Sequence, residues 1–201
     1  REFIDLFDGG SGNTPLDGLV AVLFDGATDT SYHAIDLDGQ ATDANGYFVI
    51  GNAGTPNVDL IVPDGTLQDG ADAVALYEAD GTDFPNGTGV AVTDLIDAVV
   101  YGTGGEAEDA ELLALLLPGQ GQADEDGNGA ATIESLSRLP NGGGFHRETA
   151  AFYPLGASPG DPNVVTPPAD LDLSDASDSG DSMTDNITND NTPTINGTAA
   201  P

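Results

Sequence analysis

The residues best suited to chemistry in this chain are the carboxylates and amides of the segment DLDLSDASDSGDSMTDNITND, at positions 170–190. Aspartate recurs there every two to five residues, and asparagine appears near its end. Hard cations such as Ca²⁺ bind oxygen ligands from carboxylates, amide side chains and backbone carbonyls. The segment therefore favours a structural calcium site, for which the expected ligands are Asp170, Asp172, Asp178, Asp185, Asn186, Asn189 and Asp190.

The same spacing also fits a solvated acidic spacer of no fixed shape, because runs of like charge are usually solvated. Spacing alone leaves both interpretations open. A bound cation would offset the repulsion between neighbouring carboxylates and would convert a flexible linker into a stiff one. The two interpretations therefore differ in a measurable property, since only the first predicts that Ca²⁺ binds and raises stability.

A weaker calcium candidate lies in the segment DEDGNG at positions 124–129. Asp124, Asp126 and Asn128 match the first half of an EF-hand loop, D-x-[DN]-x-[DN]-G. The twelfth position of such a loop holds a bidentate glutamate, but here it is Ser135, and Glu134 comes one residue early. A glycine-rich turn with solvated acids is the simpler interpretation.

No constellation of residues predicts catalysis. His33 and His146 each lack a second histidine or a cysteine at metal-ligand spacing. The segment GASPG at 156–160 has the form G-x-S-x-G, but a proline follows the serine and no helix is expected after it. Close carboxylate pairs are inevitable in a chain with 35 acids, so they do not indicate glycoside hydrolysis. We therefore expect no enzyme activity.

The charge and composition limit the possible partners and the compartment. A formal net charge of −32 repels nucleic acid and anionic membrane surfaces, so neither is expected as a partner. No apolar run approaches the roughly 18 residues that a membrane span needs, so membrane insertion is not expected. The absence of cysteine fits an exported bacterial protein as well as an intracellular one.

The elements that must position these residues are short strands. Up to about residue 158, apolar runs such as GLVAVLF, DAVALY and LIDAVVYG alternate with turns rich in Gly, Asn and Asp, which predicts an all-β sandwich. The segment EAEDAELLALLL predicts one short helix near 106–117. Proline, aspartate and serine then dominate, so we expect a domain at 1–163, an acidic linker at 164–190 and the first strand of a second domain at 191–201.

Residues 2–163 resemble the bacterial form of the lamin tail domain, a small immunoglobulin-like β-sandwich. The segments that carry the resemblance are FIDLFDGGSGNTPLDGLVAVLF, YHAIDLDG, DANGYFVIGN, LQDGADAVALY, LIDAVVYG, SLSRLPNG and SPGDPN. In that family a strand of the Ile-Asn-Glu type usually precedes the Glu-Phe-Ile motif, so we expect the first strand to be missing here. Arg138 lies in the SLSRLPNG segment, where we expect a structural ion pair.

Residues 168–199 are similar to the opening of the bacterial immunoglobulin-like repeats of large secreted adhesins, including those of the repeats-in-toxin type. In such repeats the acidic junctions are commonly calcium sites, which implies Ca²⁺ as a structural cofactor. The two resemblances together imply a structural or binding module of an extracellular or cell-surface bacterial protein, of the adhesin, matrix or surface-layer type. Its implied partners are neighbouring Ig-like domains of the same chain and a cell-surface or matrix ligand. The alternative is an accessory domain of a secreted nuclease or phosphoesterase.

Overall fold

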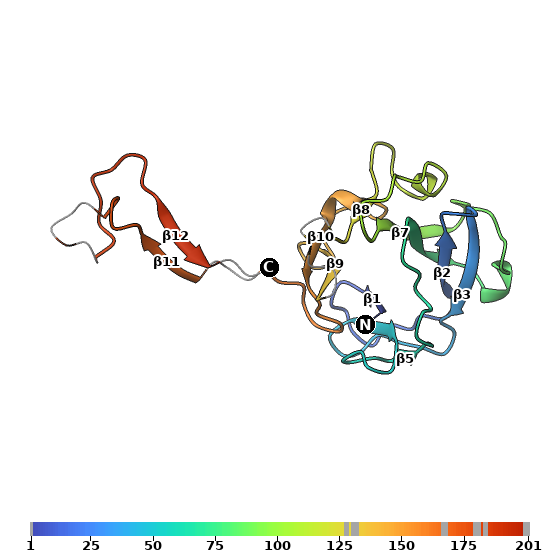
Figure 1. The fold of residues 1–201 in the computed structure, drawn as a ribbon. Helices are drawn as coiled ribbons and strands as arrows, with labels where there is room; N and C mark the ends of the chain where they lie inside the picture. The colour runs from blue at the N-terminus through green and yellow to red at the C-terminus, as the bar shows by residue number, and fades with distance from the viewer. Residues whose placement is uncertain are drawn as a thin grey trace. The chain divides into compact units, whose positions relative to one another are not determined.

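The structure, a computed structural model, describes residues 2–126, 129, 133–165, 169–178, 182 and 185–198, with the backbone alone at 169 and 170. It divides into two compact units, Arg1–Val164 and Val165–Pro201. Figure 1 shows the strands of both units along the chain.

The regular secondary structure of the first unit consists mainly of short strands joined by long loops (Figure 1). The described strands are β1 (Phe3–Phe7), β2 (Leu19–Asp25), β3 (Thr30–Asp36), β4 (Tyr47–Gly51), β5 (Leu60–Ile61), β6 (Asp72–Glu78), β7 (Leu95–Gly102), β8 (Ala123–Asp124), β9 (Glu134–Arg138) and β10 (Phe152–Gly156). Short 3₁₀ helices lie between some of them, namely η1 (Gly81–Asp83), η2 (Leu112–Leu115) and η3 (Thr149–Ala151). The predicted all-β class is therefore confirmed, and it is consistent with an immunoglobulin-like fold.

The strands described in the first unit form three sheets. The largest has the order β3-β2-β6-β7-β8, and its pairs are antiparallel except for the parallel pair β7–β8. A second sheet has the order β1-β4-β5, and β10 pairs with β9 in a third. β2 lies between β3 and β6, so its backbone is paired on both sides.

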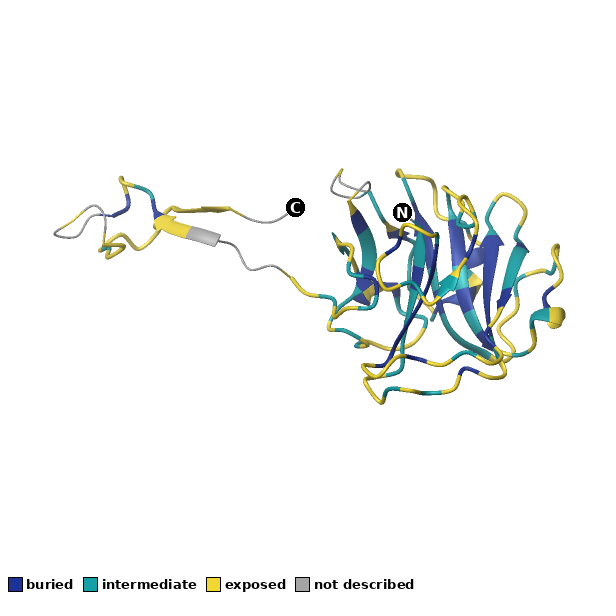
Figure 2. Cartoon of the chain, turned by 90° about the horizontal axis from the view of Figure 1, so that it is seen from below, coloured by how far each residue is buried: buried dark blue, intermediate teal, exposed yellow. Residues whose placement is uncertain are grey.

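β2 is also buried on both faces, which explains its continuous apolar run. Figure 2 shows in dark blue that buried residues lie mainly on strands. Successive side chains of a strand point to opposite faces of the sheet. Val22 and Phe24 accordingly join a core with β6, β7 and the leucines of η2. Leu23 points the other way and joins a second core with residues of β1 and β4, including Phe48. The central sheet thus separates two apolar layers.

The short helix predicted near 106–117 is present only as η2, a 3₁₀ helix of four residues, and the rest of that range is not helical. The acids expected in the first turn of a longer helix bind other backbone groups instead. The Glu106 carboxylate accepts the N–H of Gly104, and Glu108 accepts that of Gln122. Leu112 is fully buried against the central sheet. Tertiary contacts therefore override the helix propensity of the segment.

The expected ion pair of Arg138 is confirmed. Its Nη2 lies 2.8 Å from the Asp97 carboxylate, which belongs to β7. Arg147 serves the same region in a different way, because its guanidinium donates to the backbone carbonyls of Leu115 and Leu116 at the end of η2. Both arginines thus hold elements of the first unit together.

The second unit contains β11 (Ala169–Leu173) and β12 (Ile195–Thr198), which pair antiparallel. The sequence predicts an acidic linker at 164–190 and a second domain that begins at 191. The structure differs, because β11 lies inside that range and pairs with β12 from the other side of the acidic segment. Alternating Ala, Leu and Leu in ADLDL supply the apolar positions that a strand needs despite the intervening acids.

Candidate metal centre

The acidic segment turns back on itself directly after β11. The Ser174 carbonyl accepts the backbone N–H groups of Ser177 and Asp178, which closes a tight turn. The Ser177 hydroxyl then accepts the backbone N–H of Thr194 at 2.9 Å, just before β12 begins. This turn is therefore fixed to both strands of the hairpin, and it carries Asp178 into the interior of the unit.

Asp178 is only 1 % exposed. Its Oδ2 accepts the backbone N–H of Asn186 at 3.4 Å, whereas its buried Oδ1 has no hydrogen-bond partner among the described residues. The Asn186 side chain lies against the same strand, since its Oδ1 accepts the N–H of Leu173 at 2.8 Å. An unpaired carboxylate oxygen is costly in an interior, and a cation is one kind of ligand that would lower this cost.

Asp190 lies next to the same turn. The Ser177 hydroxyl is 3.5 Å from its Oδ2, while its Oδ1 accepts the N–H of Thr192 at 2.9 Å. The structure thus gathers three of the predicted ligands, Asp178, Asn186 and Asp190, around one turn. Their donor atoms are all oxygens, which fits Ca²⁺ better than a softer metal.

Of the predicted ligands whose side chains are described, only Asp178 is buried. The exposed ones are Asp172, Asp185, Asn186, Asn189 and Asp190, and Asp185 Oδ1 accepts the N–H of Ile187. The side chain of Asp170 lies outside the described residues. In the described part of the second unit no three carboxylates approach within 4.8 Å of one another. A calcium ion at Asp178 would therefore need amide and backbone carbonyl oxygens as well.

The weaker candidate lies at β8 in the first unit. Asp124 Oδ1 accepts the N–H of Asp126 at 3.0 Å, and the Asp126 carbonyl accepts that of Gly129. These bonds form a turn in which the Asp124 carboxylate accepts a hydrogen bond from a backbone N–H. Asn128 lies outside the described residues, so the proposed EF-hand half-loop is only partly described.

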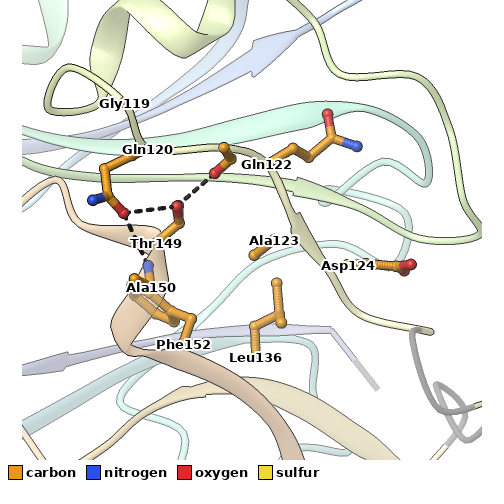
Figure 3. Close-up of a pocket in the computed structure, with 10 residues that line it drawn as sticks. Gly119, Gln120, Gln122, Ala123, Asp124, Leu136, Thr149, Ala150 and Phe152 are labelled. Carbon is orange, nitrogen blue, oxygen red and sulfur yellow. Dashed lines mark hydrogen bonds between the residues drawn. The ribbon is translucent and has the colours of Figure 1, made fainter.

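Asp124 borders a cavity of about 350 Å³ that Figure 3 shows. The polar residues on its wall bond mainly to one another. The amide oxygen of Gln120 accepts the N–H of Ala150 at 3.0 Å and the hydroxyl of Thr149 at 3.4 Å (Figure 3). Phe152 lines the cavity as an apolar side chain, and among the described residues that line it Asp124 is the single titratable group. These residues therefore offer no pair of groups for acid–base chemistry.

In the part of the chain that the structure describes, the fold assembles two acidic groups that were not predicted from the sequence. In each, carboxylate oxygens lie within 4.8 Å of one another, and the groups are Asp29 with Asp109 and Glu111, and Asp36 with Asp38 and Asp80. Burial, and then the neighbouring Asp109 and Glu111 carboxylates, raise the pKa of Asp29. The second group is exposed. Nothing local in the sequence signals these groups, because their members meet only in the folded sheet.

Comparison with known proteins bears on the second unit. Residues 164–201 match the family of bacterial Ig-like domains. The second unit is similar to a bacterial Ig-like repeat. This supports the Ig-like part of the resemblance described for residues 168–199, and such repeats are typically structural or binding modules without catalysis. No curated protein and no solved structure matches the chain significantly.

The resemblance of residues 2–163 to the lamin tail domain stays a prediction, as does the repeats-in-toxin type of adhesin. Among the described residues, no helix is long and apolar enough to cross a membrane.

Proposed function

We propose that the chain is a non-catalytic structural and binding module of a large exported bacterial surface protein, of the adhesin, matrix or surface-layer type. Its match to bacterial Ig-like domains and its all-β first unit support this role. Such a module would act by presentation, with neighbouring Ig-like domains of the same chain as partners and a cell-surface or matrix molecule as ligand. It would work outside the cell.

Calcium would stiffen the acidic part of the module. The observation that carries this proposal is Asp178, a carboxylate that is 1 % exposed and whose Oδ1 has no hydrogen-bond partner in the described part of the chain. Ca²⁺ would compensate its charge, and Asn186 and Asp190, which lie beside the turn, would supply further oxygen ligands. Since binding to the folded state stabilises it, the acidic hairpin would be firm where calcium is plentiful and looser where it is scarce.

The test is calorimetric titration of chelator-treated protein with Ca²⁺, paired with thermal unfolding. A Ca²⁺ concentration 100 times the dissociation constant should stabilise the second unit by about 2.7 kcal/mol. Asp178→Asn should abolish this gain. Asp175→Asn is the matched control, because it removes the same charge from an exposed position three residues earlier.

The effect of Asp178→Asn on the unfolding temperature without calcium provides a second test. In chelator, Asp178→Asn should raise the unfolding temperature of the second unit, because a buried unpaired charge is gone. In excess Ca²⁺ the same variant should be less stable than the wild type. A flat titration of the wild type, or equal behaviour of the two variants, would remove Asp178 from the proposed site.

A further inference from the structure

A cavity of about 390 Å³ lies on the outer face of the sheet β1-β4-β5. Phe48 and Ile50 of β4 point into the second core, so Tyr47, which alternates with them, points to the opposite face. Tyr47 lines the cavity and is 5 % exposed. Three separate loops supply the polar side chains around it, which are Asp43, Asp59, Asp161, Asn45 and Asn57. We term this the acidic cavity.

The carboxylates of the acidic cavity keep acceptor capacity that the chain does not use. Asp59 Oδ2 accepts the Val49 N–H at 2.8 Å, and Asp161 Oδ2 accepts the Asn57 amide at 3.4 Å. Among the described residues, the second oxygen of each of these two acids accepts no hydrogen bond. Both oxygens are therefore open to a donor from outside the chain.

Asp5 on β1 adds a fourth carboxylate beside the cavity. Its Oδ2 accepts the N–H of Gly160, a residue of the cavity wall, at 2.9 Å, whereas its buried Oδ1 has no hydrogen-bond partner in the described part of the chain. The charged groups that act on it are the three acids of the cavity. The one ion pair among the described residues joins Arg138 to Asp97, so no basic side chain there compensates these acids. A cation in the cavity would lower the cost of this arrangement.

The spacing of the carboxylates selects the kind of cation. Calcium holds its oxygen ligands at about 2.3–2.6 Å, so two of them lie at most about 5 Å apart. The carboxylates of the acidic cavity form no group of three within 4.8 Å of one another. They surround a space far larger than one bare ion. An ammonium or guanidinium group fits this arrangement, because its three or five N–H donors can reach acceptors on several sides.

Copies of this chain are poor sources of such a group. The sequence contains no lysine and three arginines. Arg138 is paired with Asp97, and Arg147 donates to backbone carbonyls within the first unit. Arg1 lies outside the described residues. Among the basic side chains that the structure describes, none is available for another copy, so the cation has to come from a different protein.

We propose that the acidic cavity binds a lysine or arginine side chain of a partner protein. The inference rests on the proposed function, since it names the chemistry of the ligand that the module would hold. The net charge of −32 would also attract a basic partner over a distance and raise its association rate. The cavity would then fix where on the first unit the basic side chain is seated.

NMR titration of the ¹⁵N-labelled full chain tests the site. The probe is the capped peptide acetyl-Gly-Lys-Gly-amide, and its arginine analogue is the second probe. Both should shift the backbone amides of Asn45, Asn57 and Gly160 in a saturable way and leave that of Val22 in β2 unchanged. The peptide with norleucine in place of lysine keeps the apolar stem without the charge and should cause no saturable shift. Raising NaCl from about 0.05 M to about 0.5 M should weaken the binding, because exposed charges are screened.

Matched variants separate the site from general attraction by the acidic chain. Asp59→Asn removes one charge of the cavity and keeps an oxygen for the Val49 N–H, and it should weaken the lysine peptide about two- to fivefold. Asp161→Asn should do the same, and the two together should weaken it about tenfold. Asp94→Asn is the control, because Asp94 is exposed, does not line the cavity and has a φ of +58°, which asparagine tolerates. It should bind as the wild type does.

Four outcomes would overturn the proposal. The first is the absence of saturable shifts at Asn45, Asn57 and Gly160 with both basic peptides. The second is equal binding of the norleucine peptide, and the third is equal weakening by Asp94→Asn, which would mean diffuse attraction. The fourth is a shift of these amides by Ca²⁺ and not by the peptides, which would make the cavity a metal site. The proposed function can fail separately, because its calcium titration reports on the second unit.

Discussion

Replacing Arg138 by methionine should cost the first unit much of its stability, because one guanidinium serves three purposes. Its Nη2 lies 3.0 and 2.8 Å from the two oxygens of Asp97. Its Nη1 donates to the carbonyl of Phe145 at 2.9 Å. The guanidinium carbon lies 4.7 Å from the centre of the Phe152 ring. The substitution keeps the apolar stem and removes all three interactions.

The magnitude follows from burial. Breaking a fully buried ion pair costs about 3–5 kcal/mol, but Asp97 is 28 % exposed and still accepts the Arg147 N–H, so about 2 kcal/mol is appropriate here. The carbonyl bond adds about 1 kcal/mol and the ring contact about 0.5–1 kcal/mol. The expected loss is about 3–4 kcal/mol, or roughly 10 °C in the unfolding temperature of a unit of this size.

Differential scanning calorimetry of the first unit's transition measures this loss, and a double-mutant cycle with Asp97→Asn isolates the ion pair. The stability of Arg138→Lys should lie between those of the wild type and Arg138→Met. Lysine keeps the charge, but it lacks the planar guanidinium that binds Asp97 and the Phe145 carbonyl through separate nitrogens. A loss below about 1 kcal/mol, or no coupling between positions 138 and 97, would show that the pair contributes no more than a surface ion pair.

Two further predictions concern the loop around Asp8. The Asp8 carboxylate accepts the hydroxyl of Thr14 and several backbone N–H groups, and the Thr14 bond leads the interactions that lower its pKa. Asp8→Ala should therefore lower the unfolding temperature at neutral pH, and the difference should disappear as the pH falls below the usual aspartate range, which a pH series of thermal melts would show. Gly46→Ala should destabilise by at least about 2 kcal/mol in denaturant titration, because φ is +94° and the new Cβ would overlap Asp8. Gly54→Ala meets open space and should be nearly neutral, so equal effects of the two glycine substitutions would contradict the argument.

The strands that could be predicted from sequence are those that contain runs of apolar residues. GLVAVLF and DAVALY became β2 and β6, because buried strands need apolar residues wherever they lie. β9 and β10 were not among the predicted strands. β9 reads ESLSR, with few apolar residues, and β10 contains Pro154, which usually argues against a strand. Their pairing rests on contacts such as that between Arg138 and Phe152, which no local pattern reveals.

The candidate site was only partly predictable for a related reason. Aspartate density located the segment, but density does not distinguish Asp178, which is buried, from Asp172 and Asp185, which are exposed. That distinction is made by the tight turn at Ser174, which carries Asp178 inward. The acidic groups of the first unit could not be predicted at all, because loops far apart in sequence bring them together.

The surplus of acid over base is explained in part by the backbone. Asp38 accepts the N–H of Gly18 at 2.7 Å, and Asp43 accepts that of Tyr47 at 2.9 Å. Backbone N–H groups thus bind carboxylates that have no lysine to pair with, since the chain contains none. Such acids need no cation, however densely they occur. Asp178 differs because the backbone does not reach its buried Oδ1 in the described part of the chain. The calcium site proposed for the second unit therefore rests on this buried oxygen, and not on the local density of charge.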